Sequence, residues 1–96
     1  MRYVYKVCSI KEWREASEVG FYSGSEIDVS DGFIHLSTIT QIEVTVSKHF
    51  AGQQNLVIIQ FDLKKLENKI KWEPSRAGDL FPHYYGNIKT NIKNII

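Results

Sequence analysis

The chain has 96 residues, a formal net charge of +1 and one cysteine, Cys8. This length predicts a single domain, residues 1–96, that can bury a core of its own without a metal or disulfides. The near-neutral charge gives no general attraction to nucleic acid or acidic membranes, and no apolar run approaches the length of a membrane span. One cysteine excludes an intrachain disulfide and a cysteine cluster for a metal, which fits a protein of the reducing cytoplasm.

Clear patterns predict the first elements of the chain. Residues 2–8 are rich in strand formers, and Ser9 opens a capping box, so we expect a strand followed by a helix that ends at Gly20. Trp13 lies on the apolar stripe of that helix and is expected in the core. The stretch 21–32 is rich in serine, glycine and acidic residues, which predicts a long loop.

The rest of the chain alternates between strand and helix patterns. The expected elements are a strand at 33–36, a helix from Thr38 to about Ala51, a strand at 56–61, one helical turn within 62–69, a strand at 70–73 and a strand or extended tail at 88–96. The run 56–61 is almost continuously apolar, which is typical of a central strand covered on both faces. This order of elements predicts an α+β fold.

Two segments share the pattern Asp-x-Phe-x-His, at 31–35 and at 79–83. Residues two apart in a strand share a face, so His35 and Ser37 are expected to point the same way. If that face lines a cleft, the amides that begin the next helix lie beside it and can bind an anion or a carbonyl. A histidine there can donate a hydrogen bond or transfer a proton. The alternative is a histidine satisfied by backbone carbonyls, with Ser37 acting only as a helix cap.

The second segment continues into an unusually aromatic run, residues 81–86. His83 supplies a polar ring, and Tyr84 or Tyr85 can stack on a ligand and present a hydroxyl group. The alternative is a packed aromatic edge with no ligand. We expect the two segments to meet and to line one pocket.

Three chemistries compete for such a pocket. A metal site from the two histidines and two aspartates of the repeated pattern lacks a ligand-spacing motif, so we expect no metal. Nucleophilic catalysis by Ser37 with His35 as its base lacks the strained turn that exposes such a serine. A nucleotide-type pocket uses the most residues in their natural roles, with histidine for hydrogen bonds, tyrosine for stacking and the Glu73 carboxylate for a ribose or a developing cation.

These segments resemble a known protein family. Residues 31–38 with Gln41, the pair Trp13 and Ala16, and residues 78–86 are similar to the DUF952 family of small bacterial and plant proteins of uncharacterised function. The resemblance covers nearly the whole chain. The family is similar in fold to the ADP-ribosyltransferases, which implies a split, mixed β-sheet with two main helices and a cleft that in other members holds NAD.

The resemblance also implies an activity and a ligand. Such transferases use a histidine or arginine on an early strand, a serine or tyrosine, and a glutamate on a later strand. The catalytic candidates are His35, Ser37 and Glu73. The candidates for cofactor binding are His35, Thr38, Arg76, His83, Tyr84 and Tyr85. One hypothesis is an enzyme that binds NAD or another nucleotide and transfers ADP-ribose or a related group, and the alternative is a noncatalytic module that binds a small metabolite or a peptide.

Overall fold

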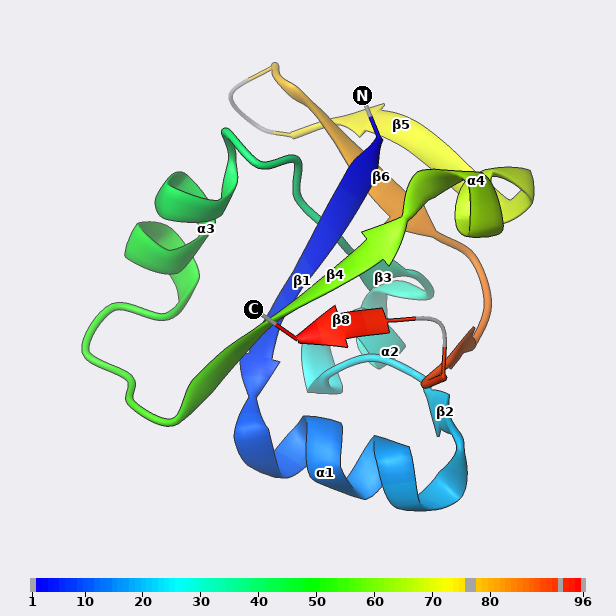
Figure 1. Ribbon diagram of the computed structural model, residues 1–96. Helices are drawn as coiled ribbons and strands as arrows, with labels where there is room; N and C mark the ends of the chain where they lie inside the picture. The colour runs from blue at the N-terminus through cyan, green and yellow to red at the C-terminus, as the bar shows by residue number, and fades with distance from the viewer. Residues whose placement is uncertain (1, 76–77, 92, 96) are drawn as a thin grey trace.

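The computed structural model describes residues 2–75, 78–91 and 93–95, and Figure 1 shows its ribbon. In chain order its elements are β1 (Tyr3–Ser9), α1 (Ile10–Val19), β2 (Phe21–Tyr22), α2 (Glu26–Asp31), β3 (Ile34–His35), α3 (Ile42–His49), β4 (Leu56–Asp62), α4 (Leu63–Leu66), the 3-10 turn η1 (Glu67–Lys69), β5 (Ile70–Pro74), β6 (Leu80–Tyr84), β7 (Ile88–Lys89) and β8 (Lys93–Ile95). The predicted α+β class is confirmed, and α1 and α3 are the longest of the described helices.

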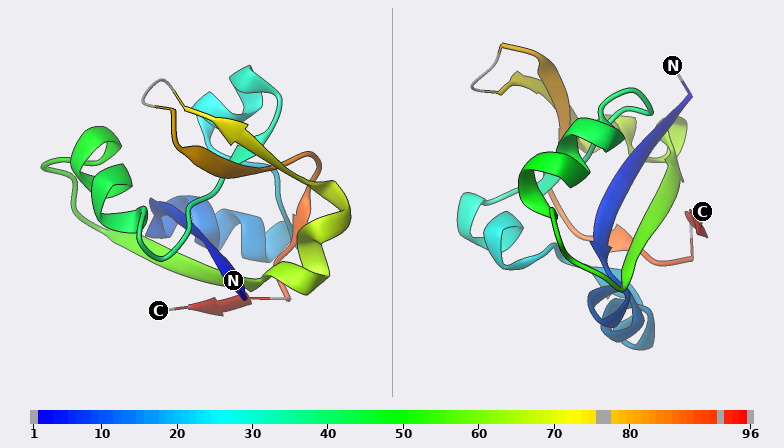
Figure 2. Two further views of the ribbon diagram at one scale, coloured as in Figure 1. Left: turned by 90° about the horizontal axis from the view of Figure 1, so that it is seen from above. Right: turned by 90° about the vertical axis from the view of Figure 1, so that its left-hand side faces the viewer.

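The strands form small antiparallel sheets rather than the expected mixed sheet. The described residues give the strand orders β1-β4-β8, β2-β7 and β3-β6-β5, and every described pairing is antiparallel. The short connection between β5 and β6 explains why these two strands are antiparallel, because a short loop can join neighbouring strands only in antiparallel orientation. Figure 2 shows the β5–β6 hairpin and the β1–β4 pair as separate parts of the molecule. A single bridge between Tyr5 and Ser37 links the β3 segment to β1.

The core lies where helix α1 meets strands β1 and β4. Ser9 accepts a hydrogen bond from the Glu12 amide at 3.0 Å, as the capping pattern predicts, and α1 ends at Gly20. Trp13 is buried, and its ring centroid lies 6.1 Å from that of Phe61 in β4. Strand β4 is central in its sheet, as predicted. Truncating an aromatic side chain in such a core costs about 3–5 kcal/mol, so Trp13 anchors the fold, as its place on the stripe indicates.

The predicted loop at 21–32 is wrong, because it contains strand β2 and helix α2. Ser25 and Asp28 form a capping box that begins α2. The helix escaped prediction because its apolar residues, Ile27 and Val29, are 60% and 65% exposed while its buried residue is an aspartate. A short helix with a polar inner face has no apolar periodicity to detect.

The second long helix begins later than predicted. Helix α3 begins at Ile42, four residues after Thr38, and ends at His49. The Thr38 amide donates to the Gln41 side chain at 3.0 Å, and the Gln41 amide donates to the Thr38 carbonyl at 3.0 Å. These bonds close a separate turn before the helix. The Gln41 side chain reaches back to the Thr38 amide as in a capping box, but the helix does not start at Thr38.

Candidate functional site

The two Asp-x-Phe-x-His segments meet in the structure. His35 in β3 and His83 in β6 are directly opposed across the strand pair, with ring centroids 5.2 Å apart. The Phe33 ring stacks on His83 at 4.2 Å with an interplanar angle of 18° and lies 4.6 Å from His35. The Tyr85 ring lies 5.3 Å from Phe33. We call these four residues the two-histidine cluster.

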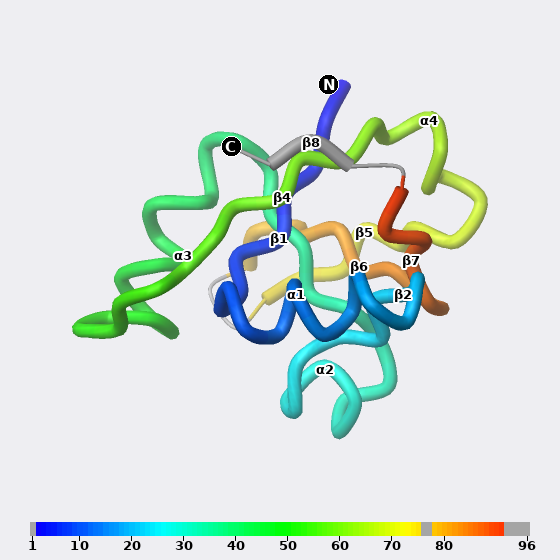
Figure 3. The backbone as a smooth tube through the Cα atoms, turned by 60° about the horizontal axis from the view of Figure 1, so that its bottom comes forward, coloured from blue at the N-terminus to red at the C-terminus, as the bar shows by residue number. Residues whose placement is uncertain are grey.

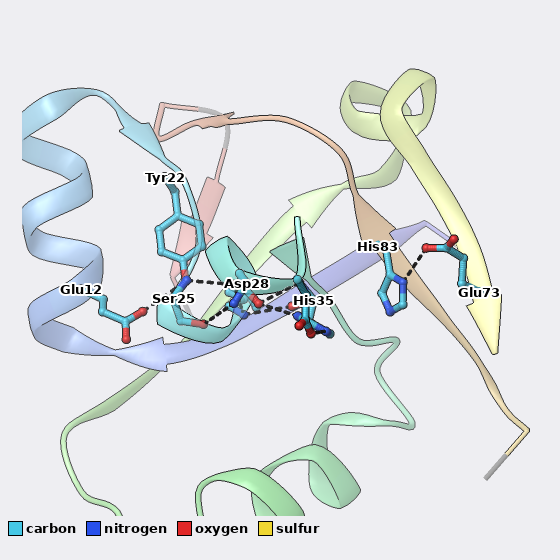
Figure 4. Close-up of polar contacts among 9 residues, drawn as sticks. Glu12, Tyr22, Ser25, Asp28, His35, Glu73 and His83 are labelled. Atoms are coloured by element: carbon cyan, nitrogen blue, oxygen red, sulfur yellow. Dashed lines mark hydrogen bonds and ion pairs between the residues drawn. The ribbon is translucent and has the colours of Figure 1, made fainter. Parts of the chain in front are cut away.

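Helix α2 delivers a buried carboxylate to His35. His35 Nδ1 lies 2.6 Å from Asp28 Oδ1, and the His35 amide donates to the same oxygen at 3.2 Å. Lys6 Nζ in strand β1 donates to Asp28 Oδ2 at 2.8 Å and to the His35 carbonyl at 3.1 Å. The Ser25 amide also donates to Oδ2, at 2.9 Å. Figure 4 shows Asp28 between Ser25 and His35, so one carboxylate fixes a helix start and a histidine ring together.

The surroundings of Asp28 keep it ionised. Burial by itself raises the pKa of this carboxyl group, but the hydrogen bond from His35 and the charge and hydrogen bond of Lys6 outweigh burial and hold the pKa well below its usual range. Because an ionised carboxylate can only accept, the proton in the short contact sits on His35 Nδ1. The other ring nitrogen, Nε2, lies 3.2 Å from Asp31 Oδ2 on the more exposed side.

A glycine makes room for this arrangement. Gly24 has φ of 104°, which favours glycine, and a Cβ at that position would lie 2.5 Å from the Asp28 Cβ. Any larger residue at position 24 would therefore push α2 and its carboxylate away from His35.

A second carboxylate orients His83. His83 Nδ1 lies 2.7 Å from Glu73 Oε1 in the neighbouring strand β5, and the Tyr85 hydroxyl donates to the same oxygen at 2.8 Å. The hydrogen bonds from His83 and Tyr85 lower the pKa of Glu73, and the bond to Glu73 raises the pKa of Tyr85. Lys71 Nζ lies 4.9 Å from the centre of the Tyr85 ring. Glu73, predicted from the sequence, thus reaches the cluster (Figure 4).

Free polar atoms remain at the cluster. Within the described part of the chain, no residue forms a hydrogen bond or ion pair with His83 Nε2, and both hydrogen bonds to Glu73 end on Oε1. His83 Nε2 and Glu73 Oε2 are therefore available to a ligand beside the aromatic rings.

Ser37 and Thr38 lie away from the cluster, contrary to the expectation from spacing. Ser37 is buried, its hydroxyl contacts Thr45 Oγ1 at 2.9 Å, and its amide donates to the Tyr5 carbonyl at 2.8 Å. The Thr38 amide is bonded to the Gln41 side chain. Two of the amides expected to bind an anion, those of Ser37 and Thr38, are therefore occupied. The shared-face argument fails because β3 ends at His35, and Ser37 then pairs with a different strand, β1.

One further predicted residue, Tyr84, also lies elsewhere. Tyr84 is buried on the opposite face of β6, because neighbouring residues of a strand point to opposite sides, and burial raises the pKa of its hydroxyl. Arg76 lies outside the described residues. Among residues 2–75, 78–91 and 93–95, no group of three or more histidine, cysteine, aspartate and glutamate side chains is arranged to hold a metal.

Sequence reasoning missed Lys6 and Asp28, and it did not include Phe33 among the candidate site residues. The one available signal is Lys6 itself, a charged residue in the middle of the apolar run 4–8. Such a lysine is almost never fully buried without a partner, which indicates a carboxylate elsewhere in the chain.

The family follows from a direct match. A family model described as "Protein of unknown function (DUF952)" matches residues 7–95. The chain belongs to the DUF952 family. No curated protein matches this DUF952 chain. In the part of the chain that the structure describes, no helix is both long and apolar enough to cross a membrane.

Solved structures with a similar fold also exist for this DUF952 chain. The crystal structure of protein CC0527 from Caulobacter crescentus is 39% identical in sequence, with a TM-score of 0.93 over 98% of this chain and 83% of that chain. The solution NMR structure of CC0527 is 40% identical, with a TM-score of 0.84 over 96% of this chain and 79% of that chain. The DUF952 chain therefore has the fold of CC0527 over nearly its whole length.

Proposed function

We propose that the two-histidine cluster binds NAD or another nucleotide and transfers ADP-ribose or a related group. The observation that carries this proposal is the convergence of His35, Glu73 and His83 from three neighbouring strands, with Nδ1 of each histidine held by a carboxylate. Holding Nδ1 in place fixes the orientation of each ring; His35 Nε2 then lies beside Asp31 Oδ2, and His83 Nε2 is the ring nitrogen that can meet a ligand.

The residue types suit a nucleotide. The Phe33 and Tyr85 rings supply faces against which a planar ring can stack. His83 Nε2 can hydrogen-bond a ribose hydroxyl or a phosphate oxygen. Glu73 Oε2 can accept a hydrogen bond from a hydroxyl group, or it can stabilise positive charge that develops on a sugar. NAD, when bound, supplies the ribosyl carbon to which a nucleophile adds as the bond to nicotinamide breaks.

The likeness of the DUF952 family to the ADP-ribosyltransferases supports the same proposal. The resemblance implies a histidine on an early strand and a glutamate on a later strand, and the presence of His35 in β3 and Glu73 in β5 agrees with that expectation. Ser37 does not take part, because its hydroxyl is bonded to Thr45 away from the cluster.

The experiment combines binding and turnover. We expect NAD or an analogue to raise the melting temperature of the protein, and His35→Ala to abolish the shift. The matched control is His49→Ala, because His49 is an exposed histidine at the end of α3, outside the cluster. The proposal fails if no member of a broad nucleotide panel shifts the melting temperature of the unaltered protein.

One observation favours a second candidate, a noncatalytic binding module. Glu73 Oε1 already accepts from both His83 and Tyr85, which gives the carboxylate a structural role in joining β5 to β6 and to the residue that follows β6. A binding module predicts ligand binding that survives Glu73→Gln, with no release of nicotinamide. Nicotinamide released by the unaltered protein and lost in Glu73→Gln would identify an enzyme instead.

A further inference from the structure

A cavity of about 760 Å³ lies outside the two-histidine cluster. Helix α4, turn η1 and strands β2 and β7 surround it, and Figure 3 shows α4, β2 and β7 toward the same side of the molecule. Its walls carry three lysines, two aromatic rings and one amide: Lys65, Lys69, Lys89, Phe21, Tyr84 and Asn87. We call this space the lysine cavity. Its volume is in the range of pockets that hold small molecules.

The charged residues that line the lysine cavity are all lysines, so its wall is positively charged. No carboxylate lines it, and none of its three lysines forms an ion pair with a described residue. Lys6 contrasts with them, because its ammonium group is paired with a buried aspartate. Three exposed lysines around one concave wall give that wall a positive potential. This potential favours an anion in the cavity.

The backbone also makes room for one of these lysines. Gly86 has φ of 147°, and a Cβ there would lie 3.3 Å from Lys69 Cδ and 3.4 Å from both Lys69 Nζ and Tyr84 Cε2. Glycine therefore allows the Lys69 side chain to lie close to the chain beside the Tyr84 ring. Lys69 Nζ and an edge atom of the Tyr84 ring therefore both lie beside Gly86 at the cavity wall.

We propose that the lysine cavity binds a phosphorylated small molecule, with its phosphate groups among the three lysines and a planar group against Phe21 and Tyr84. Lysine is a common phosphate ligand, and the Asn87 amide can add a hydrogen bond. The site is distinct from the two-histidine cluster, because Tyr84 and His83 point to opposite faces of β6. It does not depend on the function proposed for the cluster.

The experiment measures the binding of inorganic pyrophosphate and of ADP to the full chain by calorimetry at low salt. Each lysine-to-glutamine change in the cavity is expected to weaken binding about three- to fivefold. The triple variant K65Q/K69Q/K89Q should weaken it roughly 30- to 100-fold, because contacts of separate side chains with one ligand add approximately. Added salt should weaken binding to the unaltered protein.

The matched control is K11Q/K48Q/K64Q, which removes the same charge from three exposed lysines that do not line the cavity. Binding that is lost in the cavity variant and kept in the control supports the proposal. Tighter binding of ADP than of pyrophosphate, reduced by Phe21→Ser, supports the contact with a planar group. Equal loss in the two triple variants, or no binding of either probe to the unaltered protein, overturns it.

A variant of the cluster separates this site from the proposed nucleotide site. His35→Ala should leave pyrophosphate binding unchanged, whereas it should abolish the thermal shift caused by NAD. Loss of pyrophosphate binding in His35→Ala would place the phosphates at the cluster and overturn the second site.

Discussion

Removing the charge of Asp28 is expected to destabilise the protein strongly. Asp28 accepts four hydrogen bonds, from Lys6 Nζ, His35 Nδ1 and the amides of His35 and Ser25. Asp28→Asn keeps the size and the acceptor oxygen of the side chain but leaves the Lys6 ammonium, only 5% exposed, without a counter-charge. Breaking a buried ion pair by removing one partner typically costs about 3–5 kcal/mol.

This loss is large compared with the stability of a small domain. Domains typically unfold with about 5–15 kcal/mol, and each kcal/mol shifts the melting temperature of a domain of this size by about 4–8 °C. We therefore expect Asp28→Asn to lower the melting temperature by roughly 15–30 °C. Unfolding in urea and on heating, followed by circular dichroism, measures both quantities.

Two further variants test the cause of the loss. Glu26→Gln removes an exposed charge from the same helix, and it should change stability by less than about 0.5 kcal/mol. Lys6→Met combined with Asp28→Asn removes both charges, and it should recover most of the loss, because an apolar replacement of a buried pair is often neutral. The reasoning is refuted if Asp28→Asn is as stable as the unaltered protein, or if the double variant is no more stable than the single one.

Three further predictions concern the titration of Asp28, the pKa of Tyr85 and the reactivity of Cys8. The pKa of Asp28 in the folded protein lies below its ordinary value of 3.8. The ionised carboxylate therefore stabilises the fold fully above pH 3.8, and this stabilisation is lost as the pH falls below 3.8. The free energy of unfolding should drop between about pH 4 and 2 more steeply in the unaltered protein than in Asp28→Asn. Glu73→Gln should lower the pKa of Tyr85 toward 10.0, because the carboxylate that holds its proton is gone, and NMR of labelled tyrosine rings measures this. Burial, with the charge of Glu12, raises the pKa of Cys8 to about 11. A thiol reagent should therefore react slowly with the native protein at neutral pH and quickly once urea unfolds the chain. Fast reaction with the native protein would contradict this prediction.

The fold was predictable where the pattern is long and repeats. The strand at 2–8, the helix that follows it and the strand at 56–61 each carry several residues of one period, and each lies where expected. Short elements carry too few residues for a period to emerge. Helix α2 is the clearest case, because its inward residue is Asp28 and its apolar residues face outward.

The site was predictable only in part, because its members come from separate strands. The repeated Asp-x-Phe-x-His pattern correctly identified His35 and His83 as neighbours, and Glu73 also reached the cluster. Ser37 was wrongly placed because the face rule holds only while a strand continues, and β3 ends two residues earlier. The pairing of Lys6 with Asp28 depends on tertiary contacts between β1 and α2, which no local pattern encodes.

The charge state of Glu73 narrows its role in the proposed reaction. A general base that works near neutral pH needs a pKa near that pH, and burial or a like charge is what raises a carboxylate to that range. Glu73 has the opposite surroundings, because two hydrogen bonds from His83 and Tyr85 lower its pKa. It is therefore ionised at neutral pH and a weak proton acceptor. Its chemistry is that of a fixed negative charge, which stabilises positive charge on a sugar and positions His83. His83, which Glu73 positions, has an Nε2 with no hydrogen-bond partner among the described residues, so this atom is the donor or acceptor that the cluster offers to a ligand.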